Sequence, residues 1–561
     1  MMRLQTRPLL RPGKTSSPRW SLPPELLILG LSLWWLVMEH GRFFALVAEH
    51  AAPVPTTLRL ALGVGVLGLN MLLLAVLAPG RALRPVAALL TVVAALSSYY
   101  ADRYGVYLDP SMLRNVLHTQ PAEARELLGW ALAGHLLVHA GPPLLVLALC
   151  PVRARPWRRA LAWRAGLVAG SAGVLVLAVL MSFQPLASLM RNHKELRYLL
   201  VPAAAVWSSA RVLVFDAQEA AGPRQAIGLD AASIRPAAAR PQLLVLVVGE
   251  TARAANWGLN GYPRQTTPGL AARGVINFTD VTSCGTNTEV SVPCMFAPVG
   301  RRDYDEARIR RSESLLHVLA RAGVDVQWID NQTGCKGVCE GLPTTTVAEL
   351  NPPGMCEGGR CLDEGLLAGL DERLTSLHGR QVLVLHMLGN HGPSYFRRYP
   401  EAFAQFQPEC REDELQRCSR EAIVNAYDNA LLYTDHVLSR LIDTLAAHAG
   451  RVDSAMLYVS DHGESLGESG LYLHGLPYAI APAEQTRVPM VMWFSQGFAQ
   501  VSGLDTACLA GQAGQPVQHD HLFHTVLGLT GVGTALHDAA WDLTGGCRPE
   551  PPSAPAAGEV R

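Results

Sequence analysis

The chain has 561 residues, enough for more than one domain. Its 47 basic and 47 acidic residues give a formal net charge of zero. This balance excludes the strongly basic composition with which proteins bind nucleic acid through charge alone. Long apolar runs dominate the chain up to about Ser188, and beyond about Gly222 the composition is typical of a soluble domain.

Five apolar runs in the first half each approach the roughly 20 residues that a helix needs to cross a bilayer. They are approximately Leu22–Val37, Leu58–Leu77, Pro85–Tyr100, Leu127–Cys150 and Leu161–Phe183. Buried helices of a soluble protein are the alternative, but apolar runs of this length are more typical of membrane spans. The first run is not predicted to be a cleavable signal, because more spans follow it and no clear small-residue cleavage site is visible.

Basic residues near the ends of these runs predict the orientation, because cytoplasmic loops are enriched in Lys and Arg. Three clusters fall on one side of the membrane: Arg3, Arg7, Arg11, Lys14 and Arg19; Arg81 and Arg84; and Arg153, Arg155, Arg158, Arg159 and Arg164. An odd number of spans then places the C-terminal half outside the cytoplasm. We therefore predict a five-helix transmembrane domain over residues 1–190, with an external loop over residues 101–126.

The cysteines agree with an exported C-terminal half. Of 11 cysteines, only Cys150 lies in the membrane half, and eight of the others form close pairs in the sequence, which are Cys284/Cys294, Cys335/Cys339, Cys356/Cys361 and Cys410/Cys418, with Cys508 and Cys547 left over. An even number in an exported domain indicates a disulfide framework. Pairing of neighbours is the simplest arrangement, but the spacing leaves the connectivity open. A structural zinc cluster is the alternative, and the paired two-residue gaps that such clusters favour are missing.

Residues 191–240 are predicted to form a connector, in which Pro202, Pro223, Pro236 and Pro241 discourage a continuous helix. Short apolar runs beyond it are typical of buried strands: Leu243–Val248, Val324–Trp328, Val382–His386, Ala455–Val459 and Val488–Trp493. Helical patterns over Ser312–Arg321 and Arg420–Ala449 alternate with these runs. The alternation predicts an α/β domain over residues 241–548, with helices on both faces of its sheet. Residues 549–561 are predicted to be a disordered tail.

Polar residues stand at the ends of two predicted strands. Asp461 and His462 follow Ala455–Val459, and Glu250 follows Leu243–Val248. In such sheets ligands bind beyond the carboxyl ends of the strands, so these side chains are expected to converge on a divalent ion such as zinc. Taken singly, each carboxylate would more often be a helix cap or a loop residue. Their equivalent positions favour the metal site.

Thr288 ends the segment Cys284-Gly-Thr-Asn-Thr288 and precedes a predicted helix start. On its own it would more often be an N-cap. Beside a metal, its hydroxyl could join the ligands and act as a nucleophile, because the ion lowers the pKa of a bound hydroxyl. Phosphoryl transfer depends mainly on positioning and charge neutralisation, and a helix N-terminus offers N–H groups to phosphate. These features predict phosphoryl-group transfer.

Three further residues are candidates for binding the phosphate. His391 and His474 have glycine beside them, which lets a ligand approach the backbone closely. They could donate hydrogen bonds to phosphate oxygens or bind a second metal, and an ordinary surface or core histidine is the alternative for each. Lys336, between Cys335 and Cys339, could bind phosphate as a cation or be an exposed lysine.

The external loop carries polar residues at helical spacing. Asn115, Thr119 and Glu123 are four apart and would share one face of a helix, although Pro121 could shift that register. They could clamp a lipid headgroup, with Glu123 facing an ammonium. The alternative, a solvated face of an interfacial helix, fits the spacing equally well.

The ordered motifs resemble the lipid A phosphoethanolamine transferases of Gram-negative inner membranes, a sulfatase-like branch of the alkaline phosphatase superfamily. The matching segments cover nearly the whole chain, and they include Val248-Gly-Glu-Thr-Ala-Arg253, Leu259-Asn-Gly-Tyr262, Arg264, Ser283-Cys-Gly-Thr-Asn-Thr288, Ser291-Val-Pro-Cys-Met-Phe296, Lys336-Gly-Val338, Gly389-Asn-His-Gly-Pro393, Ser460-Asp-His-Gly-Glu-Ser-Leu-Gly467 and Leu473-His-Gly475. Each short motif is weak evidence, but the ordered set is specific. The surroundings of Lys336 depart from the family pattern, which affects the choice of acceptor and not the chemistry.

The resemblance implies a multi-pass protein of the bacterial inner membrane with a periplasmic sulfatase-like catalytic domain. Glu250, Thr288, Asp461 and His462 would hold one zinc ion firmly, with a second possible during turnover. Thr288 would take phosphoethanolamine from phosphatidylethanolamine in the bilayer and pass it to a lipid A phosphate, which gives polymyxin resistance. The other implied contacts to substrate are Lys336, His391, His474, Asn115, Thr119 and Glu123. Nothing in the sequence requires a nucleic acid or an obligate protein partner.

Four alternatives stay open on the sequence. A related transferase could use another envelope glycan as acceptor. A phosphoglycerol transferase of the lipoteichoic acid type shares the architecture, although the many cysteines and the Cys284–Thr288 segment oppose it. A hydrolase would complete turnover with water, and a sulfatase would need Cys or Ser at position 288. A scaffold with a degenerate site would predict that Thr288→Ala changes nothing.

Overall fold

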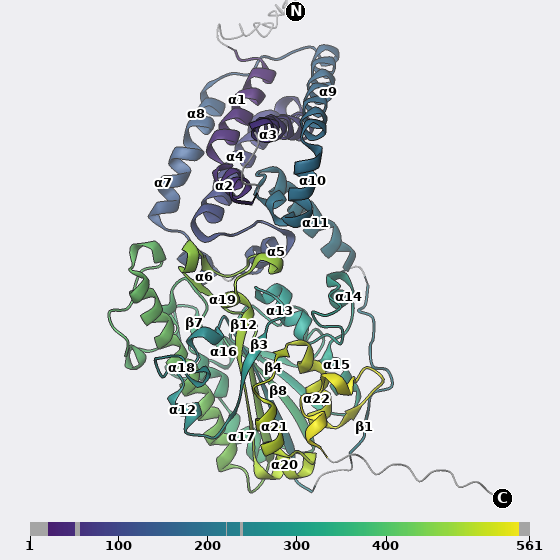
Figure 1. Ribbon diagram of the computed structural model, residues 1–561, viewed down its shortest axis with the longest axis vertical. Coiled ribbons are helices and arrows are strands. Elements are labelled where there is room, and N and C mark those ends of the chain that lie inside the picture. The colour runs from purple at the N-terminus through teal and green to yellow at the C-terminus, as the bar shows by residue number, and fades with distance from the viewer. Residues whose placement is uncertain (1–20, 51–55, 120, 220–221, 236–238, 549–561) are drawn as a thin grey trace, which may run out of the picture. The chain divides into compact units, whose positions relative to one another are not determined.

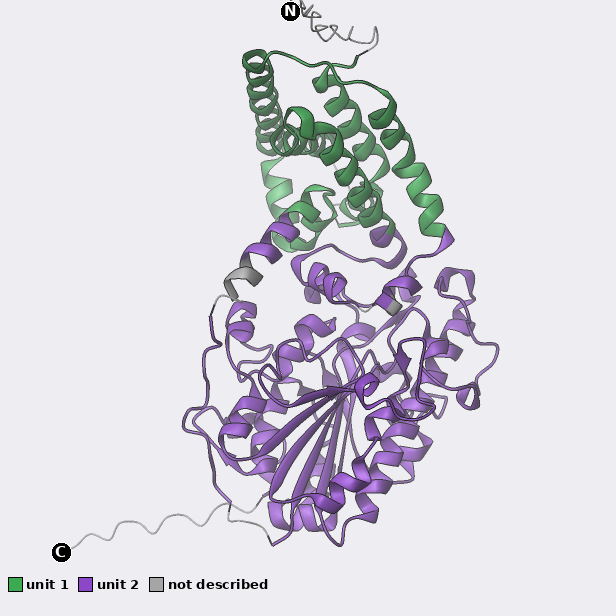
Figure 2. Ribbon diagram, turned by 180° about the vertical axis from the view of Figure 1, so that it is seen from behind, with its two compact units in different colours: residues 1–99, 131–206 green, residues 100–130, 207–561 purple. Residues whose placement is uncertain are grey.

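The computed structural model describes residues 21–50, 56–119, 121–219, 222–235 and 239–548. The predicted disordered tail, 549–561, lies outside the described residues. The chain divides into two compact units, Met1–Tyr99 with Ala131–Val206, and Tyr100–Trp130 with Trp207–Arg561 (Figure 2). The first unit is built from helices, and the second contains the large sheet (Figure 1).

Among the described residues, three helical stretches are long and apolar enough to cross a membrane: α3 (Thr56–Leu77), the stretch Gly80–Tyr104 that contains α4 (Leu83–Tyr104), and α9 (Trp157–Met181). Two more candidates are bent pairs, α1 (Pro24–Met38) with α2 (Gly41–His50), and α7 (Trp130–His139) with α8 (Gly141–Leu149). Counted as one span each, the pairs complete the five predicted spans. The first and fourth spans are thus broken helices, which the apolar pattern did not predict.

Small and apolar residues explain how these helices pack. A side chain at Gly68 of α3 would approach the Ser171 carbonyl oxygen of α9 to 3.2 Å, so glycine permits the close contact of the two backbones. Many large apolar side chains in this unit remain exposed, including Val37 (74 %) and Leu137 (73 %). Exposed apolar surface on this scale is expected where lipid, and not water, surrounds the protein.

The predicted external loop contains the helices α5 (Pro110–His118) and α6 (Pro121–Glu126). The sequence assigns it to the membrane domain, whereas the structure groups it with the sheet-containing unit. Ion pairs within that unit are the physical reason: Arg114 with Glu306, His118 with Glu289, and Glu126 with both Arg360 and Arg398. Such contacts between residues far apart in the chain leave no periodic signal in a sequence.

Helices lie on both sides of an eight-stranded sheet in the second unit (Figure 2). In spatial order its strands are β13 (Val517–Gln518), β3 (Ile276–Thr282), β12 (Arg487–Phe494), β9 (Asp453–Ser460), β2 (Gln242–Gly249), β8 (Arg380–His386), β4 (Asp325–Asp330) and β5 (Thr344–Thr346). Only β12 runs antiparallel to its neighbours, and all other pairs are parallel. Every residue of β2 and β9 is buried, as expected for apolar strands covered on both faces.

All five predicted strand runs are confirmed as β2, β4, β8, β9 and β12. The pattern missed β3, because its sequence Ile-Asn-Phe-Thr-Asp-Val-Thr mixes polar residues into a partly exposed strand. The long predicted helix is α18 (Arg420–Ala447), which Ser419 caps through the Ala422 N–H. The predicted connector contains one helix of 17 residues, α11 (Ala203–Glu219), placed between Pro202 and Pro223.

Five disulfides join the ten cysteines of the second unit. The four neighbouring pairs are confirmed, and the remaining Cys508 and Cys547 pair with each other across a separation of 39 residues. Cys150 is free. The disulfides therefore close loops of very different length, from 4 residues for Cys335–Cys339 to 39 for Cys508–Cys547.

Loop length predicts which disulfide stabilises the fold most. Replacing Cys508 and Cys547 by alanine is expected to lower the free energy of unfolding by about 4 kcal/mol, because the open chain regains the entropy of a long loop. The same change at Cys335 and Cys339 should cost only about 2 kcal/mol. Denaturant melting of the two double variants against the parent protein measures both losses. Equal losses would contradict the loop-length argument.

Candidate active site

Four side chains converge beyond one edge of the sheet. Glu250 follows β2, and Asp461 and His462 follow β9. Because β12 is antiparallel to both β3 and β9, the strand β3 runs parallel to β9 and ends at the same edge. The chain then enters α13 (Thr288–Met295), whose first residue is Thr288. All four residues are at most 3 % exposed.

The distances among these side chains define a compact cluster. The Thr288 hydroxyl lies 3.1 and 3.3 Å from the two carboxylate oxygens of Glu250 and 3.4 Å from His462 Nε2. His462 Nε2 in turn lies 3.2 Å from Glu250 Oε1 and 3.4 Å from Asp461 Oδ2. One ligand atom each from Glu250, Asp461 and His462 falls within 4.8 Å of the others. These three side chains therefore converge, as the sequence predicts, and could hold a metal ion.

The electrostatics of the cluster fit a bound cation. Burial, and then the charge of Glu250, raise the pKa of Asp461 to about 6. Burial alone would lower the pKa of His462, but Asp461 and Glu250 outweigh it and raise that pKa to about 10. Asp461 Oδ2 accepts no hydrogen bond from the described residues. Two adjacent buried carboxylates need positive charge between them, so the donor set suits a divalent metal.

The backbone around the ligands holds them in place. His462 Nδ1 lies 3.0 Å from the Gly463 carbonyl oxygen, so a proton on Nδ1 leaves Nε2 as the ligand atom. The Thr251 N–H donates to Asp461 Oδ1 (3.2 Å), and its hydroxyl donates to Glu250 Oε1 (2.6 Å). Thr251 has a φ of 60°, which is strained for a β-branched residue. Strain at this point is typical of a functional site.

Thr288 is not the cap of its helix. The N-cap of α13 is Asn287, whose side chain accepts a hydrogen bond from the Val290 N–H. The Thr288 hydroxyl is therefore available to the buried cluster. This geometry removes the simplest structural explanation of Thr288 and favours a chemical role.

Two histidines extend the cluster. The ring of His474 lies 4.3 Å from that of His462 and 5.3 Å from that of His391, measured between centroids. His474 Nδ1 lies 2.7 Å from Glu464 Oε2, while the Tyr395 hydroxyl donates to Glu464 Oε1 at 2.6 Å. Burial raises the pKa of Glu464 to about 7. The structure thus brings His391 and His474 to the site, as the sequence predicts.

Lys336 lies beside α13, the helix that Thr288 begins. Its ammonium is 3.2 Å from Glu289 Oε1, its side chain is 3 % exposed, and Glu289 follows Thr288 directly. His118 of the loop bonds the same carboxylate at 2.8 Å. Burial opposes ionisation of Glu289, but His118 and Lys336 outweigh it and lower the pKa of Glu289 to about 2. Lys336 is therefore a buried cation near the site.

The three loop residues do not share one helix face, so that prediction is wrong. The helix α5 ends at His118, Thr119 is its C-cap with extended backbone, and α6 starts afresh at Pro121. Proline at the start of a new helix is the physical reason. Asn115 belongs to α5, and its carbonyl accepts the Thr119 hydroxyl at 2.7 Å. The side chain of Glu123 lies outside the described residues.

Comparisons with known proteins agree with this geometry. Residues 242–532 match the Sulfatase family model, and residues 66–216 match "Phosphoethanolamine transferase EptA/EptB". Phosphoethanolamine transferase EptA of Escherichia coli K12 is 41 % identical over 474 residues, which cover 83 % of this chain and 86 % of that protein. The chain belongs to the phosphoethanolamine transferases.

Two further matches extend over almost the whole chain. Phosphatidylethanolamine transferase Mcr-2 of Escherichia coli is 37 % identical over 91 % of this chain and 96 % of its own length. The structure of the integral membrane lipooligosaccharide phosphoethanolamine transferase EptA from Neisseria meningitidis superposes with a TM-score of 0.88 at 39 % identity, covering 94 % of this chain and 99 % of that one. This phosphoethanolamine transferase is thus an inner-membrane protein with a sulfatase-like periplasmic α/β domain.

Sequence reasoning missed two polar groups of the transferase site. Glu464 stands in the Asp461-His-Gly-Glu464 motif, three residues after a predicted ligand, and its position in that motif was an available signal. Glu289 falls within the predicted helix start, and its ion pairs with Lys336 and His118 join segments far apart in the chain. Only the fold could reveal these ion pairs of Glu289.

The raised pKa of Glu464 predicts a pH-dependent stability in the metal-free transferase. A carboxyl whose pKa rises from 4.5 to about 7 on folding destabilises the fold as pH climbs through that interval, because the unfolded chain ionises first. Glu464→Gln keeps the shape and removes the charge. Between pH 4.5 and 8 the free energy of unfolding of Glu464→Gln should rise relative to that of the parent by on the order of 3 kcal/mol. Melting curves of both metal-free proteins across this range measure the gain, and a constant difference would refute it.

Proposed function

We propose that this transferase moves phosphoethanolamine from phosphatidylethanolamine to a phosphate of lipid A through a phosphoethanolamine–threonine intermediate on Thr288. The carrying observation is the Thr288 hydroxyl, uncommitted to its helix cap and 3.1 Å from a Glu250 carboxylate oxygen inside a buried ligand cluster. The relatives support the substrates, since one is named a phosphatidylethanolamine transferase and another a lipooligosaccharide phosphoethanolamine transferase.

In the first step the Thr288 oxygen attacks the phosphorus of the donor. A bond forms between them, the bond from phosphorus to the diacylglycerol oxygen breaks, and diacylglycerol leaves with a proton. In the second step an oxygen of the lipid A phosphate attacks the same phosphorus, the bond from phosphorus to the Thr288 oxygen breaks, and the released Thr288 oxygen takes up a proton from the solvent. A zinc ion held by Glu250, Asp461, His462 and Thr288 would lower the pKa of the hydroxyl and neutralise the phosphate charge.

The remaining residues bind and orient the phosphate. We assign Lys336, His391 and His474 to its oxygens, because all three carry groups that donate hydrogen bonds and the two histidines lie beside the cluster. The ion pair with Glu289 holds the Lys336 ammonium beside α13, the helix that Thr288 begins. Asn115, Thr119 and Glu123 are proposed to contact the lipid headgroups. A second zinc during turnover would lie at the two histidines.

Lipid A mass spectrometry tests this function. The chain is expressed in a polymyxin-sensitive Gram-negative host, and lipid A is compared with that from cells expressing Thr288→Ala. The expected result is a gain of one phosphoethanolamine unit and a rise in polymyxin resistance, both absent in the variant. Resistance follows because the added ammonium makes the surface less anionic. If lipid A stays unmodified in cells that contain the folded protein, the assignment of lipid A as acceptor is wrong. The acceptor would then be another envelope glycan.

A further inference from the structure

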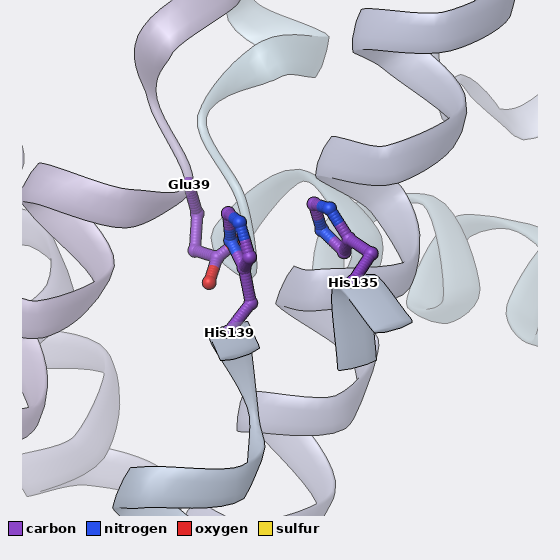
Figure 3. Close-up of side chains that lie close together, drawn as sticks. All are labelled: Glu39, His135 and His139. Atoms are coloured by element: carbon purple, nitrogen blue, oxygen red, sulfur yellow. The ribbon is translucent and has the colours of Figure 1, made fainter. Parts of the chain in front are cut away.

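A second cluster of metal-ligating side chains lies in the first unit, apart from the transferase site. Glu39, His135 and His139 point toward one another from two different segments of the chain (Figure 3). One ligand atom from each falls within 4.8 Å of the others. None of these residues belongs to the phosphoryl-transfer machinery.

The cluster lies where two candidate spans break. Glu39 is the C-cap of α1, next to the 54° bend into α2. His139 is the last residue of α7, next to the 48° bend into α8. Broken helices in a bilayer persist only where other groups satisfy the freed backbone, and here the Trp34 indole donates to the His139 carbonyl at 2.7 Å. Breaks of this kind are common ion sites in membrane proteins.

The distances suit ligands of a single ion. Glu39 Oε2 lies 3.3 Å from His139 Nδ1, close to the separation of about 3.4 Å expected for two ligands that are each about 2.1 Å from a tetrahedral zinc. The rings of His135 and His139 stack with centroids 3.7 Å apart, since residues four apart share a helix face. Ser98 bonds Glu39 Oε2 and lies 3.3 Å from His135 Nε2, so it orients both ligands.

The chemistry and burial of these three side chains indicate which ion they would bind. The Glu39 side chain is fully buried, and that of His139 is 19 % exposed. An ionisable group inside a membrane span is costly and generally functional, so a buried carboxylate between two imidazoles calls for a cation. Two histidines at i and i+4 with one carboxylate form a donor set typical of zinc, whereas magnesium and calcium prefer all-oxygen ligands.

We propose that Glu39, His135 and His139 bind one zinc or similar transition-metal ion in the membrane domain. The ion ties the break between α1 and α2 to the break between α7 and α8. This site is independent of the one at Thr288, and it holds whether or not the proposed lipid A chemistry is correct.

Metal content of the full-length protein tests the proposal. Protein purified in detergent is equilibrated with Zn²⁺, freed of excess metal, and analysed for zinc per chain. The double variant His135→Ala/His139→Ala should hold one zinc fewer than the parent. Asp461→Asn should lower the content independently, so the triple variant loses both ions. The zinc content of these variants therefore shows separately whether each of the two sites binds zinc.

A matched control lies in the same unit. His50 and His193 also stack, at 3.9 Å, and His193 Nδ1 lies 3.2 Å from Glu195 Oε1, yet among the described residues these three do not form a metal-binding group. His50→Ala/His193→Ala should keep the parental zinc content. Glu39→Gln provides a second test, because it keeps the size of the side chain and should weaken zinc binding at least tenfold. If His135→Ala/His139→Ala and Glu39→Gln both bind as much zinc as the parent, and as tightly, the proposal is overturned. The three residues would then form only a hydrogen-bonded network.

Discussion

Thr288→Ala will reduce phosphoethanolamine transfer by about 10³-fold or more, because it removes the only atom that can carry the group between donor and acceptor in the proposed mechanism. The fold should be unaffected, since Asn287 and not Thr288 caps α13. The measurement is turnover of phosphatidylethanolamine by purified protein, together with intact mass after donor alone is added. The parent should gain the mass of one phosphoethanolamine, and the variant should not.

Thr288→Ser is the matched control. It keeps a hydroxyl and should therefore retain both measurable turnover and the covalent adduct, while Thr288→Ala and Thr288→Ser should melt within about 1 kcal/mol of the parent. Undiminished transfer by Thr288→Ala would refute the nucleophile. If Thr288→Ala lost activity because it unfolded, the Thr288 hydroxyl would be needed for the stability of the fold, contrary to this prediction.

Asp461→Asn is expected to abolish turnover and zinc binding at the transferase site, yet to stabilise the metal-free protein. Folding raises the pKa of Asp461 from 3.8 to about 6, so its ionised form destabilises the fold. The parent is therefore most stable at low pH, where Asp461 is protonated, and it loses stability as the pH rises from 3.8 to about 6. At pH 7.5 this cost is fully present, and the attraction between Asp461 and His462 offsets part of it. Asparagine carries no charge and keeps the oxygen that accepts from Thr251.

The test compares the melting temperatures of Asp461→Asn and the parent, first in a chelator and then with zinc. In a chelator the Asp461→Asn protein should melt higher than the parent by several degrees. With zinc the parent should gain from binding, and the order should reverse. The advantage of the variant in chelator should disappear at pH 4. If the parent melted higher in both conditions, burial and the charge of Glu250 would not raise the pKa of Asp461 in the folded, metal-free protein.

Local patterns predicted what depends on local sequence. The apolar runs predict the strands β2, β8 and β9 because a strand buried on both faces must be continuously apolar. The convergence of Glu250, Asp461 and His462 follows from the ends of those strands. The partly polar β3 escaped this logic. So did the bends at Glu39 and His139, because an apolar run looks the same whether the helix within it is straight or broken.

Contacts between distant segments could not be predicted in this way. The pairing of Glu289 with His118 joins residues 171 positions apart, and the cluster of Glu39 with His139 joins residues 100 positions apart. Neither leaves a periodic trace, and both depend on how helices pack. The predicted helical register of the loop is wrong for a different reason, since Pro121 ends the pattern of α5 and begins the new helix α6.

The anchoring of the loop bears on inhibitor discovery. In the whole chain His118 bonds the carboxylate of Glu289, the residue after Thr288, and a side chain at Gly475, next to His474, would collide with Met112 of α5. A fragment that starts after the membrane helices lacks both His118 and Met112. Compounds selected against such a fragment would be optimised for a surface that the loop covers in the native enzyme. Screening campaigns should therefore use the full-length protein.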